Sequence, residues 1–200
     1  MSQGPSTTGA TPPEDFDSVL EEVARRREEF TEKRHVPRDM VGRFKELGLY
    51  RATTPRRFGG DALPPSDFLR AIERISQADG SAGWVASFGV SGVYLAALPE
   101  ETQAKIYADG PDLVFAGGLF PVQPVEQADG GYTVSGRWKF ASGCMAAELM
   151  GVGIGGGADG RPRTAVMSPE QVEVVENWEA VGLEGTGSHD LAVHGAFVPE

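Results

Sequence analysis

The sequence predicts an α+β protein with helices in its first half and β-strands in its second. Apolar residues recur at helical spacing up to about residue 110, and beyond Pro111 short Gly-, Val- and aromatic-rich segments alternate with turn signals. No helical period lies between those segments, which favours an antiparallel barrel or sandwich. We therefore expect a flexible tail over 1–15, an N-terminal helical domain over 16–110 and a β-domain over 111–200.

The first two helices follow the Ser/Thr/Gly/Pro-rich tail. The first is amphipathic and is expected from Phe16 to about Arg34, with Glu and Arg on its polar face. Pro37 can open the second helix as its first residue, and Gly48 is a plausible stop. Residues 51–65 hold prolines and a Gly pair without a clear period, which predicts a loop.

Three further helices are expected before the strands. Ser66 is placed to cap the third, which ends near the Asp-Gly pair at 79–80. Ser81 is placed to cap the fourth. That helix covers 82–98 and is apolar nearly all round, so it is expected to be buried. Pro99 then begins a short fifth helix, with acidic residues where the helix dipole favours them.

The second half reads as short strands joined by tight turns. Asp-Gly-Gly at 129–131 predicts a hairpin. Asp159-Gly160 separates a strand over 149–154 from one over 164–167 in the same way. Further strands are expected at 172–175 and 191–193.

Charge and composition exclude several classes of function. Of the 200 residues, 18 are Lys or Arg and 29 are Asp or Glu, so the net charge is −11, which makes nucleic acid an unfavourable partner. No apolar run of about twenty residues is present, so no membrane span is expected. The N-terminus lacks the basic and apolar regions of a signal or transit peptide, which makes the cytoplasm the expected location. One cysteine and three scattered histidines predict no metal site.

Three patterns suggest chemistry that their context does not support. Residues 151–156 match a dinucleotide-binding fingerprint, but a turn rather than a helix follows them, so we expect a strand. Ser188, His189 and Asp190 are neighbours in one strand and therefore point to opposite faces, unlike a hydrolytic triad. Cys144 is expected to be a small buried hydrophobic residue rather than a reactive thiol.

Three stretches resemble the acyl-CoA dehydrogenase superfamily and occur in its order. The first is Ala-Asp-Gly-Ser-Ala-Gly-Trp at 78–84. The second, Tyr-Thr-Val-Ser-Gly-Arg-Trp-Lys-Phe-Ala-Ser-Gly-Cys at 132–144, is similar to the strand pair that lies against the flavin. The third is Trp-Glu-Ala-Val-Gly-Leu-Glu-Gly-Thr-Gly-Ser-His-Asp at 178–190, followed by Phe-Val-Pro-Glu at 197–200. The resemblance implies a helical domain, a middle β-domain and, in the family, a C-terminal four-helix bundle that this chain lacks.

Within the superfamily, the chain resembles the two-component flavin-dependent monooxygenases, such as the hydroxyphenylacetate and steroid-phenol hydroxylases. Phe-Ala-Gly-Gly-Leu-Phe-Pro at 115–121 stands where the dehydrogenases usually carry Thr-Glu-Pro, and Phe-Ala-Ser-Gly at 140–143 stands where many have Trp-Ile-Thr-Asn. The resemblance implies an oxygenase component that hydroxylates an aromatic or polycyclic small molecule with O₂. It would receive reduced FMN or FAD from a separate NAD(P)H:flavin reductase, and at full length it would form a homo-oligomer, a tetramer.

The resemblance also implies which residues form the flavin site. Ser142 is the expected catalytic residue, because its hydroxyl would stand at the N5 edge of the flavin. Ala116 and Gly117 would present backbone groups to the pyrimidine end of the ring. The expected cofactor-binding residues are Trp84, Ala116, Gly117, Phe140, Ala141, Ser142 and Gly143.

An apolar wall must keep water from the reaction, and four aromatic residues are candidates for it: Trp84, Phe115, Trp138 and Phe140. Core packing is the alternative for each of them. For Ser142, the alternative is a serine that bonds its own turn.

Two other functions fit the same residues. One is an acyl-CoA dehydrogenase-like flavin oxidoreductase, and the other is an inactive fragment or binding module that retains the fold. We expect the chain to be either a fragment of a longer protein or a short chain whose other part is separate or lost. If it stands alone, apolar surface on the helix of Trp84 and on the β-domain should be exposed, and flavin retention by this chain alone should be weak.

Overall fold

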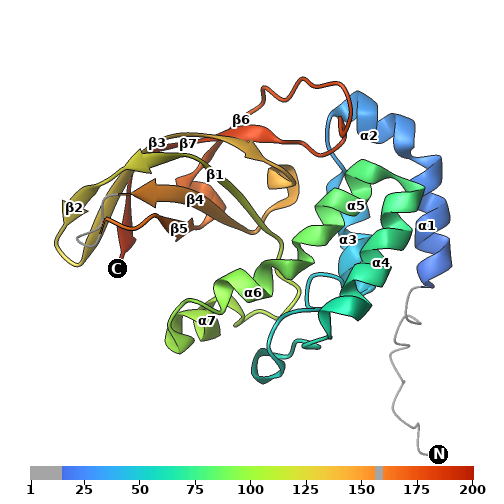
Figure 1. Cartoon of the computed structure of the whole chain (residues 1–200), viewed down its shortest axis with the longest axis horizontal. Coiled ribbons are helices and arrows are strands. Elements are labelled where there is room, and N and C mark those ends of the chain that lie inside the picture. The colour runs from blue at the N-terminus through green and yellow to red at the C-terminus, as the bar shows by residue number, and fades with distance from the viewer. Residues whose placement is uncertain (1–14, 156–159) are drawn as a thin grey trace, which may run out of the picture.

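The computed structural model describes residues 15–155 and 160–200, with helices on one side of the molecule and a sheet on the other (Figure 1). This α+β order is the one predicted. The last helix, α7 (Glu100–Ile106), ends shortly before the first strand, β1 (Phe115–Pro124). The division into a tail and two domains stays a prediction, and all but one residue of the expected tail lies outside the described residues. None of the helices in the described ranges has the length and apolar character that a bilayer crossing requires.

The helix expected over 16–34 is interrupted at Arg26, where φ is −96° and ψ is 7°. The guanidinium of Arg26 lies within 3.0 Å of carboxylates of Glu22, Glu29 and Asp39, and these contacts hold the break in place. The helices are α1 (Phe16–Arg25), α2 (Arg27–Lys33), α3 (Arg38–Glu46), α4 (Pro65–Ala78), α5 (Gly80–Ala86), α6 (Ser91–Leu95) and α7, with 3₁₀ turns η1 (Arg56–Phe58), η2 (Ser87–Val90), η3 (Cys144–Ala146) and η4 (Pro169–Gln171).

Two predicted helix caps are wrong. Helix α4 begins at Pro65, so Ser66 lies inside its first turn. Proline suits the first helical position, because it has no N–H that needs a partner there. Helix α5 is capped by Asp79 rather than by Ser81: Oδ1 of Asp79 accepts a hydrogen bond from the N–H of Ala82 at 2.8 Å.

The helix expected over 82–98 consists of α5, η2 and α6. The hydroxyl of Thr53 donates to the carbonyl of Gly89 at 2.7 Å, and this carbonyl is thereby drawn toward the 49–54 segment. Gly89 packs so closely on that segment that a Cβ would lie 2.0 Å from the carbonyl oxygen of Leu49. The prediction that this stretch is buried all round is wrong, because Trp84 is 49% and Tyr94 is 62% exposed. The exposed apolar surface expected beside Trp84 is confirmed.

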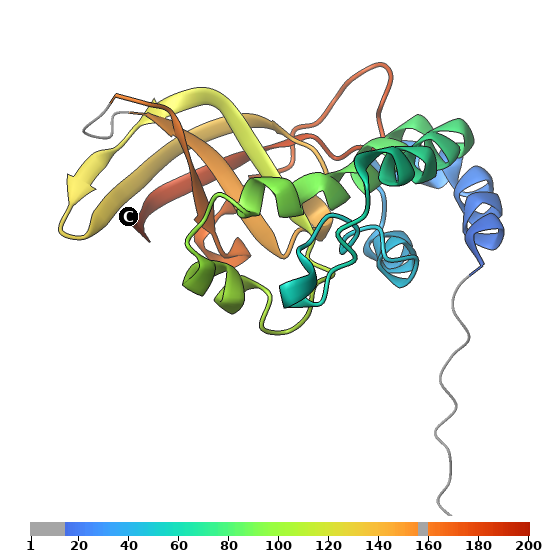
Figure 2. The same ribbon diagram turned by 60° about the horizontal axis from the view of Figure 1, so that its bottom comes forward.

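The described strands form one curled sheet in the order β5-β4-β1-β3-β7-β6, with β2 paired to β3 (Figure 2). Strand β1 is followed by β2 (Glu126–Ala128), β3 (Gly131–Ala141), β4 (Leu149–Gly155), β5 (Arg163–Met167), β6 (Glu173–Val175) and β7 (His189–Pro199).

The sheet is mixed, although an antiparallel one was predicted, because β1 and β4 pair in parallel. The chain reverses through η3 after β3, so β4 runs antiparallel to β3 and parallel to β1. It lies beside β1 because β7 occupies the other edge of β3.

The predicted hairpin is confirmed: Ala128 pairs with Gly131 across the Asp-Gly turn. Strands β4 and β5 also pair antiparallel, as expected, but Asp159 lies outside the described residues. The described part of the dinucleotide-like stretch is strand β4, in agreement with the prediction.

Each half has its own apolar core. The helical core includes Phe30, Phe44 and Ile75, and the core of the sheet includes Val134, Trp138 and Leu191. Trp138 is fully buried, and its indole N–H donates to the carbonyl of Gly153 at 2.6 Å. This contact ties β3 to β4 beneath the outer face of the sheet.

Candidate active site

A bulge near the end of β3 turns Phe140 out of the core. Trp138 pairs with Leu191 and Ala141 pairs with His189, so three steps on β3 oppose two on β7. Trp138 and Ala141 therefore both point inward, and Lys139 and Phe140 between them are exposed. Phe140 has a φ of +62°, a conformation that is unfavourable for a bulky residue and that is enriched at functional sites.

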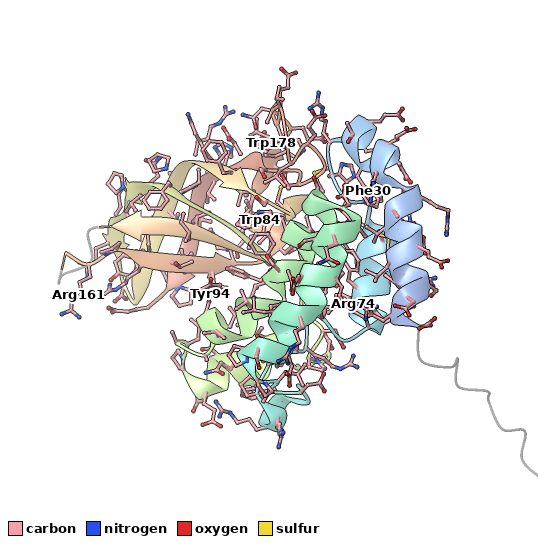
Figure 3. The ribbon with its side chains drawn as sticks, turned by 45° about the vertical axis from the view of Figure 1, so that its right-hand side comes forward. Phe30, Arg74, Trp84, Tyr94, Arg161 and Trp178 are labelled. Carbon is pink, nitrogen blue, oxygen red and sulfur yellow. The ribbon has the colours of Figure 1, made fainter. Side chains whose placement is uncertain are left out.

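Trp178 stands beside Phe140 on the segment between β6 and β7. The two rings meet edge to face with centroids 6.2 Å apart. The segment runs from the sheet toward α2 and α5. Trp178 lies near the β6 end of this segment, and Figure 3 labels it together with Trp84 on α5. Phe140 and Trp178 line a cleft of about 430 Å³ together with Arg137, Lys139, Asn177, Glu179, Ser188 and Asp190. This volume lies in the range of roughly 300–1,000 Å³ that small-molecule sites occupy.

Ser142 lies at the end of a chain of buried hydroxyls. Its Oγ is 2.7 Å from Oγ of Ser188, which is 2.6 Å from Oγ1 of Thr186. Three hydroxyls joined by two hydrogen bonds have one proton left over. If Thr186 donates to Ser188 and Ser188 donates to Ser142, the spare proton is on Ser142. Ser142 is therefore not a serine that only bonds its own turn, although its backbone N–H does donate to the carbonyl of Phe140 at 3.0 Å.

Ala116 and Gly117 lie on β1, where both pair with β4. In the described register, β1 and β3 pair at Phe120 and Lys139, and no pair joins 115–119 to 140–143. The β3-facing backbone of Ala116 and Gly117 is therefore not used by a strand ladder. A Cβ at Gly117 would lie 2.9 Å from the carbonyl oxygen of Gly151, so a larger residue would disturb the pairing with β4.

Helix α5 meets this region at Gly143. Gly143 has a φ of +75°, and a Cβ there would contact Val85 and Phe88 at 3.7 Å. Trp84 packs edge to face on Phe88 with centroids 6.0 Å apart. The structure thus places the exposed ring of Trp84 next to the helix residues that cover Gly143.

The four aromatic candidates for an apolar wall divide into two pairs. Trp84 and Phe140, 49% and 64% exposed, are surface aromatics that could face a ligand. Phe115 packs with Leu95 and Tyr107, and Trp138 is fully buried. Core packing, the alternative considered for each candidate, is therefore what the structure shows for Phe115 and Trp138. Both fill the interior, because inward positions on β1 and β3 alternate with outward ones.

Ser188, His189 and Asp190 do not form a triad, in agreement with the sequence. The carboxylate of Asp190 accepts from Nε of Arg137 at 2.7 Å, and Nδ1 of His189 accepts backbone N–H groups. Cys144 is buried as expected, and burial raises the pKa of its thiol to about 12. At neutral pH this thiol is protonated and a poor nucleophile.

Of the residues that line the cleft, only Phe140 was among the predicted ones. Ser188 was considered only as part of a rejected triad, and Trp178 only as part of a motif. Their roles depend on the approach of the 176–188 segment to the end of β3, where the N–H of Gly143 donates to the carbonyl of Thr186 at 2.8 Å. Sequence spacing carries no signal for such a contact.

Residues 17–109 match the family described as the acyl-CoA dehydrogenase N-terminal domain. The chain is 52% identical over 190 residues to an indole-3-acetate monooxygenase of Pseudomonas putida, an alignment that covers 92% of this chain and 49% of that protein. It is 36% identical to the oxygenase component of an FADH(2)-dependent resorcinol hydroxylase of Rhizobium sp. (strain MTP-10005), with 84% and 42% covered.

The chain is also similar to a solved structure. The crystal structure of 3-HSA hydroxylase from Rhodococcus sp. RHA1 superimposes with a TM-score of 0.85 at 33% identity, covering 92% of this chain and 49% of that one. The chain spans about half the length of the relatives it matches.

Proposed function

We propose that this chain is part of the oxygenase component of a two-component flavin monooxygenase. Its sequence and fold are those of the acyl-CoA dehydrogenase superfamily, and its relatives are flavin monooxygenases. The observation that carries the proposal is the end of β3, where a strained, exposed Phe140 stands next to a buried hydroxyl chain that ends at Ser142. The substrate would be an aromatic small molecule, and a separate NAD(P)H:flavin reductase would supply reduced FMN or FAD.

The residues present fit a flavin ring. Phe140 and Trp84 offer exposed aromatic surface, and in the described register no strand pair joins residues 115–119 to residues 140–143. A bound reduced flavin supplies the electrons with which O₂ is activated. The protein must orient the ring and exclude water, and apolar side chains around a polar edge suit both tasks.

Ser142 would hold a proton at the polar edge of the ring. Its Oγ can receive the hydrogen bond of Ser188 and donate its own proton outward, because a hydroxyl is donor and acceptor at once. With 7% of its surface exposed, Ser142 is shielded from bulk water but borders the cleft through Ser188. A fixed donor of this kind favours negative charge that develops beside it.

The exposed apolar residues support the proposal that another part of the protein, or another subunit, covers this surface. Phe120, Phe140 and Tyr94 are each more than 60% exposed, and apolar surface of this extent is usually covered in the working protein. The relatives are about twice as long as this chain, so the covering would come from the other half of the protein or from another subunit of a homo-tetramer. Cytoplasmic location stays a prediction.

The test uses the full-length protein with a flavin reductase, NADH and indole-3-acetate as the first aromatic substrate. Ser142→Ala should leave flavin oxidation intact but release hydrogen peroxide in place of hydroxylated product. Ser135→Ala is the matched control, because Ser135 lies on the same strand but bonds the N–H of Gly195, away from the cleft. An unchanged product yield per flavin oxidised in Ser142→Ala would remove Ser142 from the mechanism. Flavin reduction by an acyl-CoA would favour the dehydrogenase-like alternative.

A further inference from the structure

His189 joins the segment that carries Trp178 to the sheet. It is the first residue of β7 and is 4% exposed. Its Nδ1 accepts hydrogen bonds from the backbone N–H groups of Asn177 and Trp178, both at 3.0 Å. We call these two hydrogen bonds the His189 clamp.

The clamp requires a neutral imidazole. A backbone N–H can only donate, so Nδ1 must carry a lone pair, and the ring proton must be on Nε2. The opposite ring orientation would place a carbon there and leave both N–H groups without an acceptor. Protonation of Nδ1 would set an N–H against two other N–H groups, and both hydrogen bonds would be lost.

The clamp also determines where Trp178 lies. Beside it, the N–H of Asp190 donates to Oδ1 of Asn177 at 3.0 Å, and the indole N–H of Trp178 donates to the carbonyl of Glu184 at 3.0 Å. Two residues beyond Trp178 the segment is attached to the helical half, since the guanidinium of Arg34 donates to the carbonyl of Ala180 at 3.1 Å. The clamp therefore secures the end that presents Trp178 to Phe140.

We propose that His189 is a positioning residue whose neutral Nδ1 holds Trp178 against Phe140 and thereby makes one wall of the cleft depend on pH. The clamp itself rests on hydrogen-bond geometry alone. Its effect on flavin binding rests on the proposed function.

The charged groups around His189 act in both directions. Burial is the largest influence and lowers the pKa of His189 below its ordinary value of 6.5, and nearby His35 lowers it further, whereas Glu176 and Asp190 raise it. Because the folded-state pKa is depressed, the stability that neutral His189 contributes is fully present above 6.5. It is lost as the pH falls from 6.5 toward the folded-state pKa. The clamp therefore begins to weaken below pH 6.5.

The test compares two substitutions of nearly equal shape in the full-length protein. In His189→Asn, the side-chain oxygen can stand where Nδ1 stands and accept the same N–H groups, but it does not titrate in this pH range. His189→Leu has the same branching without an acceptor. His194→Asn is the control, because His194 lies on the same strand, is exposed and pairs with Glu173 outside the cleft.

Hydrogen exchange at the amides of Asn177 and Trp178, corrected for the intrinsic pH dependence, reports the clamp directly. We expect protection to fall about tenfold or more in His189→Leu and to be retained in His189→Asn, since each lost backbone hydrogen bond favours local opening. Between pH 7.5 and 5, protection should fall in the wild type and in His194→Asn but not in His189→Asn. Equal protection in His189→Leu and the wild type would overturn the proposal, as would a pH dependence that persists in His189→Asn.

Flavin affinity is measured on the same variants by titration with reduced FMN and FAD under anaerobic conditions. We expect weaker binding in His189→Leu than in His189→Asn. If exchange shows that the clamp opens but flavin affinity does not change, the link between the clamp and the cleft is wrong. If no variant or wild-type protein binds flavin while the exchange result holds, the proposed function fails and the clamp stands.

Discussion

Replacing Phe140 with Gly and with Ala separates the backbone of this position from its ring. Both substitutions remove a side chain that is 64% exposed, so the burial lost is small and equal. They differ because φ is +62°, a conformation that costs an L-residue about 1–2 kcal/mol and glycine almost nothing. Relative to alanine, glycine makes folding about 0.5–1 kcal/mol less favourable, because the unfolded chain is more flexible. We therefore expect Phe140→Gly to be more stable than Phe140→Ala by about 0.5–1 kcal/mol.

Urea unfolding of the full-length protein measures this difference, with equal m-values as the condition for comparing midpoints. A less stable Gly variant would refute the reasoning, since it would mean that the strained φ costs less than glycine's entropy. Both variants should bind reduced flavin about equally weakly, because both lack the ring. Unchanged flavin affinity in both would remove Phe140 from the proposed site.

Three further results are expected. Trp138→Phe should lower the free energy of unfolding by about 2–4 kcal/mol, because it leaves the buried carbonyl of Gly153 without its donor and opens a small void, and urea unfolding measures this. Asp79→Ala should cost about 1 kcal/mol through loss of the α5 cap, whereas Ser81→Ala, at the position first expected to be the cap, should cost less. Cys144 should react with a thiol reagent at pH 8 at least roughly 100-fold more slowly in the native protein than in urea, and comparable rates would contradict its burial and raised pKa.

The order of helices and strands could be predicted because it depends on local period. Turn chemistry likewise located the hairpin at Asp129-Gly130. The parallel pairing of β1 with β4 could not be predicted, because it depends on β1 and β7 occupying both edges of β3, which leaves β4 the other edge of β1. The cap of α5 was misassigned because Asp79 and Ser81 are both good capping residues, and only the backbone at Asp79, extended with φ −159°, distinguishes them.

The predicted flavin site depended on resemblance, and the structure adds physical reasons for part of it. Alternation along β3 would bury one of every two residues, and the bulge breaks this rule at Phe140, which no local pattern signals. The partners of Ser142 were also out of reach, because Ser188 lies 46 residues away along the chain. Resemblance suggested Ser142 as a site residue, and the fold shows which hydroxyls bond it.

Phe140 gains little from the described residues that surround it. Its ring is mostly exposed, and its edge contact with Trp178 is worth about 0.5–1.5 kcal/mol, which at most offsets the cost of its backbone conformation. The backbone is nevertheless held on both sides, by buried Trp138 and Ala141 and by the bond from the N–H of Ser142 to its carbonyl. A ring fixed at a strained position without burial can gain stability only from something that covers it. Under the proposed function, a planar ligand that reaches Ser142 at the same time would satisfy this requirement.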